Sequence, residues 1–169
     1  PYTSGNMDET LVLYDSRPDG KDLADRELGL LISEIEKTGA HILVTLDCCH
    51  SGSGTRDMNE IAPTYVERLT ENRTDKRTLD SYLNGYYISN GLQFPNPKHI
   101  LLAACNRFQT AKETYTSSGV FTDNLIKTLN NIGSEISYAD LFVRMRQGVI
   151  SNNIPDQDPQ LELMGGTLG

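Results

Sequence analysis

The residues with the clearest capacity for chemistry form one short run, Asp47-Cys48-Cys49-His50-Ser51-Gly52. This run directly follows residues 41–46, an apolar segment rich in β-branched side chains that predicts a buried strand of a parallel sheet. Open α/β sheets build their active sites just beyond the carboxyl ends of such strands. A thiol beside an imidazole and a hydroxyl at that point indicates nucleophilic catalysis by a thiolate.

The three cysteines differ in their expected roles. Free cysteine is among the most often buried residues, so Cys48 and Cys105 are interpreted as packing residues. The sequence His-Ser-Gly after a strand is poorly suited to a core, which favours a chemical role for Cys49. A zinc site built from Cys48, Cys49 and His50 is disfavoured, because adjacent residues do not readily converge on a tetrahedral ion.

The elements that must position this run alternate between strands and helices. Strands are expected at residues 11–14, 42–46, 100–105 and 159–163, the last as an edge strand. A first helix is expected after a cap at Asp25, with an inward stripe of Leu28, Leu31, Ile32 and Ile35 and an end at Gly39. The alternation predicts an α/β fold with a mainly parallel sheet.

Two further helices are expected in the second half of the chain. One places Phe121, Leu125 and Leu129 on a single face. The other is opened by a capping box of Ser137 and Asp140 and turns Leu141, Met145 and Val149 inward.

Residues 54–98 are polar and weakly patterned, and so long a stretch in a compact domain is typical of a functional loop. The stretch offers basic sites for activation or self-processing by a cut between residues 56 and 77. The candidate cleavage sites are Arg56, Arg68, Arg73, Lys76 and Arg77.

Composition excludes several classes of function. The 169 residues are expected to form one domain with a core of its own. Fifteen basic and 23 acidic residues give a net charge of −8, which argues against nucleic acid and suits a positively charged substrate or partner. No apolar run approaches the roughly 20 residues of a membrane span. Three cysteines, two of them adjacent, make no disulfide framework, so a cytoplasmic, intracellular location is expected.

The run ending in Cys49-His50-Ser51-Gly52 closely resembles the nucleophile motif of the metacaspases and the bacterial caspase-like cysteine peptidases. In these enzymes the cysteine directly before His-Ser-Gly attacks the peptide bond, which implies Cys49 as the nucleophile. Segments 100–105, 109–111, 119–122 and 137–141 resemble the small subunit of the bacterial enzymes. The resemblance implies a caspase-like, doubly wound, mainly parallel sheet flanked by helices. It divides the chain into the end of a large catalytic subunit (1–56), an intersubunit linker (57–98) and a small subunit (99–169).

The resemblance also implies a catalytic histidine in a Ser-Gly-His-Gly element on the preceding strand, and this chain contains no such element. His50 is the neighbour of Cys49 and points to the other face of extended backbone, while His41 and His99 open their strands instead of following them. We therefore expect the base and the N-terminal strands of the sheet to lie before Pro1. They would belong to a missing segment of the same protein or to a partner chain.

Asp47 stands two residues before Cys49, so in extended backbone both side chains emerge on one face. A carboxylate there would pair with an arginine of the substrate through two hydrogen bonds. The family uses the aspartate of this motif in a pocket for arginine or lysine. The expected function is therefore a cysteine endopeptidase acting on protein substrates after basic residues. The alternative for Asp47 is a turn cap or a partner for a backbone amide.

Two other functions stay open. One is a catalytically silent caspase-fold adaptor, and the other is a separase-like or legumain-like peptidase of the same clan. No cofactor is expected to be required. Calcium activation of many metacaspases makes an acidic cluster near the N-terminus a weak calcium candidate, although its spacing fits no EF-hand loop. Its candidate ligands are Asp8, Glu9 and Asp15.

Overall fold

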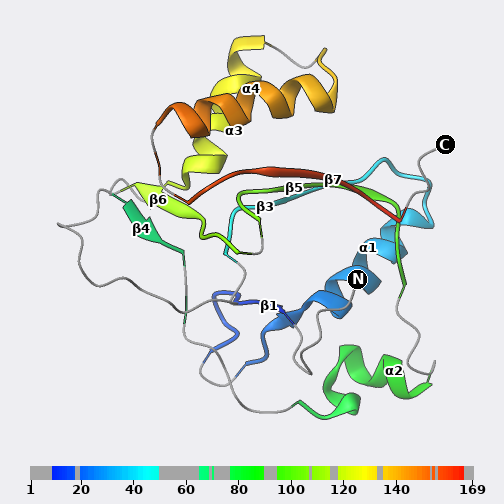
Figure 1. Cartoon of the computed structure of the whole chain (residues 1–169). Coiled ribbons are helices and arrows are strands. Elements are labelled where there is room, and N and C mark those ends of the chain that lie inside the picture. The colour runs from blue at the N-terminus through cyan, green and yellow to red at the C-terminus, as the bar shows by residue number, and fades with distance from the viewer. Residues whose placement is uncertain are drawn as a thin grey trace. The chain divides into compact units, whose positions relative to one another are not determined.

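The computed structural model describes most of the chain (Figure 1). The described residues are 9–17, 20–49, 65–68, 70, 77–89, 95–106, 108–114, 118–132, 135–152, 154 and 156–165. They fall into two compact units, each assembled from separate stretches of sequence. The first unit contains residues 1–42, 71–99 and 164–169, and the second contains residues 43–70 and 100–163. The candidate nucleophile belongs to the second unit.

The first unit is built around helix α1 (Asp25–Glu36). Strands β1 (Thr10–Leu11) and β2 (Leu23–Ala24) pair antiparallel before it, and η1 (Leu79–Ser81), η2 (Leu83–Gly85) and α2 (Tyr86–Ser89) complete the unit. The predicted strand at 11–14 is wrong beyond its first residue, because Val12, Leu13 and Tyr14 are exposed and unassigned to a strand.

The predicted inward face of α1 is also partly wrong. Leu31 and Ile35 are 44% and 49% exposed, whereas Glu27 and Leu30 are buried. The helix begins at Asp25, so the capping position is Ala24, whose N–H donates to Glu27 Oε2 over 3.0 Å. Glu27 is buried because its carboxylate accepts two hydrogen bonds from Arg77, at 2.8 and 2.9 Å. Gly39 follows the helix with φ of +76°, a conformation that favours glycine.

The second unit holds a three-stranded sheet in the order β3-β5-β7. Strand β3 (Leu43–Leu46) runs parallel to β5 (His99–Ala103), with Leu43 opposite Ile100 and Leu46 opposite Ala103. Strand β7 (Gln160–Met164) lies at the edge, as the sequence predicts. A separate antiparallel pair joins β4 (Tyr65–Glu67) to β6 (Lys112–Thr114). The architecture is a mixed α/β fold with small sheets, in which the β3–β5 pair is parallel.

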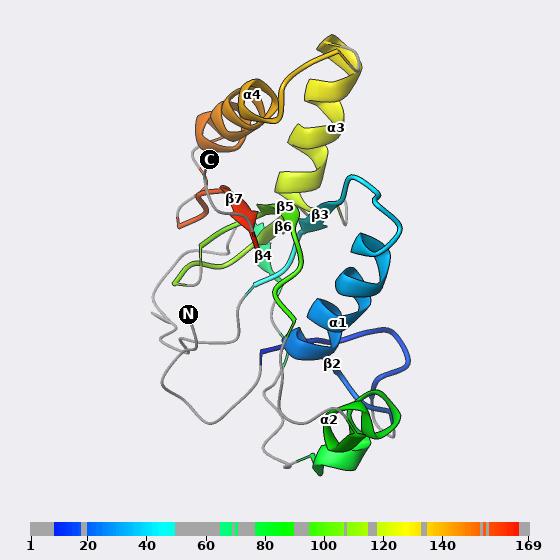
Figure 2. The same ribbon diagram turned by 90° about the vertical axis from the view of Figure 1, so that its right-hand side faces the viewer.

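Helices α3 (Val120–Ile132) and α4 (Tyr138–Ser151) cover one face of the three-stranded sheet (Figures 1 and 2). The predicted cap of α4 is confirmed, since Ser137 Oγ accepts the Asp140 N–H over 3.1 Å. Its predicted inward residues Leu141, Met145 and Val149 are all buried. In α3 Phe121 is buried, but Leu129 is 40% exposed and does not complete the predicted stripe.

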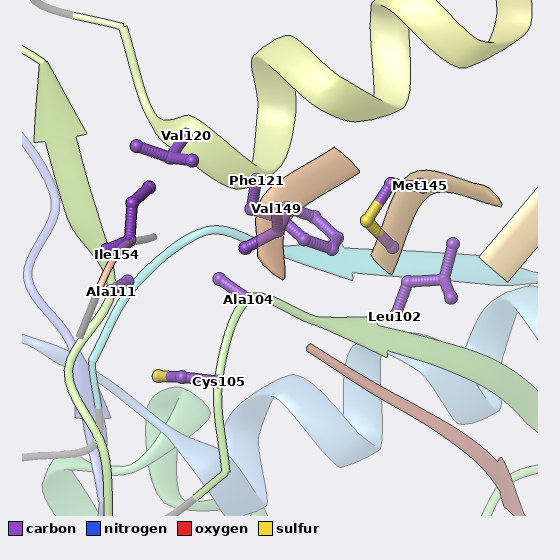
Figure 3. Packing of buried hydrophobic residues seen from close by; sticks show 9 residues of the cluster. All are labelled: Leu102, Ala104, Cys105, Ala111, Val120, Phe121, Met145, Val149 and Ile154. Carbon is purple, nitrogen blue, oxygen red and sulfur yellow. The ribbon is translucent and has the colours of Figure 1, made fainter. Parts of the chain in front are cut away.

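The core of the second unit lies between these helices and the end of β5 (Figure 3). Its largest fully buried side chains include Phe121, Leu102 and Met145. Cys105, just past β5, is 1% exposed, which confirms its role as a packing residue. Burial raises the pKa of the Cys105 thiol to about 12, so this sulfur stays protonated and unreactive at neutral pH.

We expect Met145→Ala to lower the free energy of unfolding by about 2–5 kcal/mol, because it leaves a cavity in a fully buried site. Urea denaturation followed by circular dichroism measures the loss. Val143→Ala, on the exposed side of the same helix, is the matched control and should change the free energy by roughly 0.5 kcal/mol or less. Equal effects of the two substitutions would contradict the assigned packing.

Among the described residues no helix is both long enough and apolar enough to cross a lipid bilayer.

Candidate active site

The candidate nucleophile lies directly beyond the carboxyl end of β3. The Ala104 N–H donates to the Leu46 carbonyl over 2.9 Å, which continues the β3–β5 pairing past the last paired strand residue. Asp47, Cys48 and Cys49 follow, and the Cys105 thiol lies 3.9 Å from the Cys48 carbonyl oxygen. The cysteine run is thus tied to the buried core. His50, Ser51 and Gly52 lie outside the described residues.

The Cys49 sulfur is half-buried against the backbone that enters β6. The Ala111 N–H donates to Cys49 Sγ over 2.8 Å, and the thiol lies 3.4 Å from the Ala111 carbonyl oxygen. Burial raises the pKa of the Cys49 thiol above its ordinary value, although N–H groups of Ala111 and Arg68 favour the thiolate. Attack by this sulfur at neutral pH therefore requires a base that removes its proton.

Cys48 is half-buried, and its pKa is raised chiefly by burial. Cys49 itself packs against the edge of the core. The expectation that Cys48 faces the core while Cys49 faces the substrate remains a prediction.

The Asp47 carboxylate is held at the start of α3. Its Oδ2 accepts hydrogen bonds from the Thr122 N–H over 3.2 Å and from Thr122 Oγ1 over 2.6 Å. Gly119 leaves the space for it, because a Cβ at that position would lie 1.9 Å from Oδ2. The other oxygen, Oδ1, is buried and has no hydrogen-bond partner among the described residues. The carboxylate therefore retains an acceptor that a ligand could use.

Arg68 brings a positive charge to this carboxylate. Its Nη1 donates to the Asp47 carbonyl oxygen over 3.0 Å and lies 3.7 Å from Asp47 Oδ2. Its Nε donates to Glu113 Oε2 over 3.2 Å, and its backbone N–H donates to the Ala111 carbonyl over 3.0 Å. Asp47 and Glu113 thus form an acidic site that binds a guanidinium group.

Sequence reasoning missed several of these residues. Ala111, Glu113, Gly119 and Thr122 lie far along the chain from Asp47 and Cys49. Gly119 and Thr122 were within a segment that resembles the small subunit, but nothing in the local sequence assigned them a role. For Gly119 and Thr122, the sequence signal that could have been used is a glycine immediately before an expected helix and a threonine in the first turn of that helix.

The histidines that the structure describes stand at the opening ends of the strands. His99 is the first residue of β5, and its Nδ1 lies 2.9 Å from the Pro97 carbonyl oxygen. His41 precedes β3, whereas Cys49 follows it. A base from outside the described residues therefore remains the prediction.

The candidate cleavage sites have different surroundings. Arg77 belongs to the first unit, where it pairs with Glu27, donates to the Asp22 and Ser81 carbonyls and lies 4.1 Å from the centre of the Tyr82 ring. Burial opposes ionisation of Glu27, but the hydrogen bonds from Arg77 and from backbone N–H groups hold its pKa below the usual value. Arg68 belongs to the site itself, and the others lie outside the described residues: Arg56, Arg73 and Lys76.

The calcium candidates stay a prediction. Of the three, Asp8 lies outside the described residues, and Asp15 is exposed. The Glu9 carbonyl accepts the Asp25 N–H over 2.9 Å. Within the described part of the chain, no three His, Cys, Asp or Glu side chains come together as a metal site would require.

Comparison with known proteins gives a family match and a structural match. Residues 6–165 match the family model described as the caspase domain of the C14 peptidases. A crystal structure of a protein from Geobacter sulfurreducens matches with a TM-score of 0.55 and 22% sequence identity. That match covers 96% of this chain but 63% of the other, so the chain spans less than two thirds of the protein it resembles. None of the curated proteins matches the sequence significantly.

Proposed function

Since the chain belongs to the caspase domain family, we propose that it carries the nucleophile of a cysteine endopeptidase that cleaves polypeptides after arginine or lysine. Cys49 is the proposed nucleophile and Asp47 the proposed recognition residue. The observation that carries the proposal is the guanidinium group of Arg68, which lies beside the largely buried carboxylate of Asp47, two residues before the thiol.

The acidic site favours a basic side chain over an acidic one. Asp47 is 11% exposed at its side chain, so its charge is poorly screened by water. A substrate arginine could donate to Oδ1, which has no hydrogen-bond partner among the described residues, and a substrate aspartate there would be repelled. Glu113 adds a second negative charge to the same site.

The proposed reaction begins when a base removes the proton from the Cys49 thiol. The sulfur then forms a bond to the carbonyl carbon of the substrate's basic residue, and the carbonyl oxygen takes up the negative charge. The backbone N–H of Cys49 is the proposed donor to that oxyanion. When the C–N bond breaks, the amine leaves with the proton that the base had taken. Water then hydrolyses the thioester, which releases the acid and restores the thiol.

The test uses the full-length protein and three fluorogenic peptides that differ only in the residue before the leaving group. We expect cleavage after Arg and Lys and none after Asp. Cleavage after Asp would contradict the proposed specificity. If a folded protein cleaved no peptide and no protein substrate, the silent adaptor would be the better description. A separase-like or legumain-like enzyme would show different preferences for the residues along the peptide.

We also expect activation to involve a cut between residues 56 and 77, where the basic candidates stand. Incubation of active protein followed by intact mass spectrometry should detect two fragments. The Cys49→Ala protein should stay whole, because the cut requires the thiol. Active protein whose residues 54–98 remain uncut would contradict obligatory processing.

A further inference from the structure

Strand β4 ends beside the backbone that contacts the Cys49 sulfur. It pairs antiparallel with β6, with Tyr65 opposite Thr114, Val66 opposite Glu113 and Glu67 opposite Lys112 (Figure 1). The pairing continues for one more residue through the hydrogen bond from the Arg68 N–H to the Ala111 carbonyl. Ala111 also contacts the Cys49 sulfur. A strand that pairs with β6 in this way therefore ends next to the candidate nucleophile.

Arg68 directly follows β4 and is joined to Ala111, the residue that contacts the Cys49 sulfur. Its backbone N–H donates to the Ala111 carbonyl, whose oxygen lies 3.4 Å from the Cys49 sulfur, and it favours the Cys49 thiolate. Its side chain reaches in the other direction to Asp47 and Glu113. One residue therefore places its backbone at the nucleophile and its guanidinium group in the acidic site.

The preceding residue of the strand meets a charge of the opposite sign. Glu67 Oε1 accepts a hydrogen bond from Lys112 Nζ over 2.7 Å and another from Thr110 Oγ1 over 3.2 Å. The Lys112 side chain is only 10% exposed, and its other hydrogen bond goes to the Thr110 hydroxyl. If β4 left, the buried ammonium group would lose its acidic partner, at a large cost in free energy.

We propose that β4 and Arg68 form an internal pseudosubstrate. Its last two residues, Glu67 and Arg68, then correspond to the dipeptide that the site prefers. In this arrangement Asp47 binds the basic residue before the scissile bond, and Lys112 selects an acidic residue immediately before that one. The pseudosubstrate (Tyr65–Arg68) must leave β6 before a substrate can bind. This inference rests on the proposed function and adds to it a second specificity residue and an occupant of the site.

The competing explanation is that β4 is a permanent strand of the fold. A permanent strand would not exchange with a peptide added in solution. The two explanations therefore differ in whether a free peptide of the same sequence can take the place of the pseudosubstrate.

The first measurement is the rate at which iodoacetamide alkylates Cys49 in the full-length protein, a readout that needs no catalysis. Tandem mass spectrometry distinguishes Cys49 from Cys48. We expect the double variant Glu67→Gln, Arg68→Gln to be alkylated about tenfold faster than wild type, because its strand is held less firmly. Arg146→Gln removes a different ion pair, to Asp158, and should leave the rate unchanged.

The second measurement adds peptides to the double variant. The peptide acetyl-Tyr-Val-Glu-Arg-amide should slow alkylation, and acetyl-Tyr-Val-Lys-Arg-amide should need about tenfold more peptide for the same effect. A third peptide, acetyl-Tyr-Val-Glu-Gln-amide, tests the basic residue separately. If Arg matters and Glu does not, the role of Lys112 is overturned and the proposed function stands. If replacing Arg has no effect, the proposed basic specificity fails.

If the double variant does not fold, a charge-reversal variant provides the test instead. Lys112→Glu repels the Glu67 of an otherwise intact strand, so it should raise the alkylation rate and reverse the peptide preference toward Tyr-Val-Lys-Arg. Adding Glu67→Lys to that variant should restore slow alkylation. Rates that remain at the wild-type value in every folded variant, with no protection by any peptide, would overturn the pseudosubstrate.

Discussion

Replacing Cys49 by alanine should abolish the peptidase activity of the full-length protein, with a loss of about a thousandfold or more in kcat/KM. The reason is chemical, since the substitution removes the protein atom that forms the covalent bond to the substrate in the proposed mechanism. The Cys49 sulfur also sits at the backbone of Ala111, the residue that leads into the proposed peptide-binding strand β6. Hydrolysis of an arginine peptide by matched amounts of the two proteins measures the effect.

Cys48→Ala is the matched control, because it removes a neighbouring thiol of similar exposure. We expect it to retain most of the activity. Circular dichroism should show that both variants are folded, so that lost activity cannot be attributed to unfolding. Equal losses in the two folded variants would remove the basis for choosing between the cysteines.

Asp47→Asn should weaken the preference for arginine by about 10- to 100-fold, the value of roughly 1.5–3 kcal/mol for a hydrogen bond to a charged group. Asparagine keeps the shape of the side chain and an oxygen that can accept from Thr122. The substitution therefore removes the charge while preserving the contact with the start of α3. This separates substrate recognition from the structural role of the carboxylate.

The comparison uses two peptides that end in arginine or in citrulline, its neutral isostere. We expect kcat/KM for the arginine peptide to fall in Asp47→Asn, and kcat/KM for the citrulline peptide to change little. An equal fall for both peptides would indicate that Asp47 serves only to hold the backbone. Glu113→Gln, which neutralises the more exposed acid, should reduce the arginine preference to a smaller extent.

Local patterns predicted those parts of the fold whose causes are local. The cap at Ser137 and the stripe through Met145 are adjacent in sequence, and the structure confirms both. The stripe of α1 was partly wrong, because the burial of Glu27 depends on Arg77, 50 residues further along the chain. A helical period contains no information about such a partner.

The candidate site shows the same division. Asp47 and Cys49 could be selected because the motif itself is a short run after a strand. Their contacts could not, since Ala111 is 62 residues from Cys49 and Thr122 is 75 residues from Asp47. Local sequence patterns indicate which side chains could take part in chemistry. The fold determines which other groups those side chains contact.

The order β3-β5-β7 has a consequence for a protein cut between residues 56 and 77. Strand β3 would then belong to one fragment and β5 to the other, so the parallel ladder from Leu43 to Leu46 would join two separate chains. We expect the fragments to migrate together in native gel filtration and to separate only in denaturant. Loss of the first fragment would leave one side of β5 with unpaired backbone groups, which is a template for aggregation. Such a cut would thus convert one chain into a complex of two chains that share a sheet.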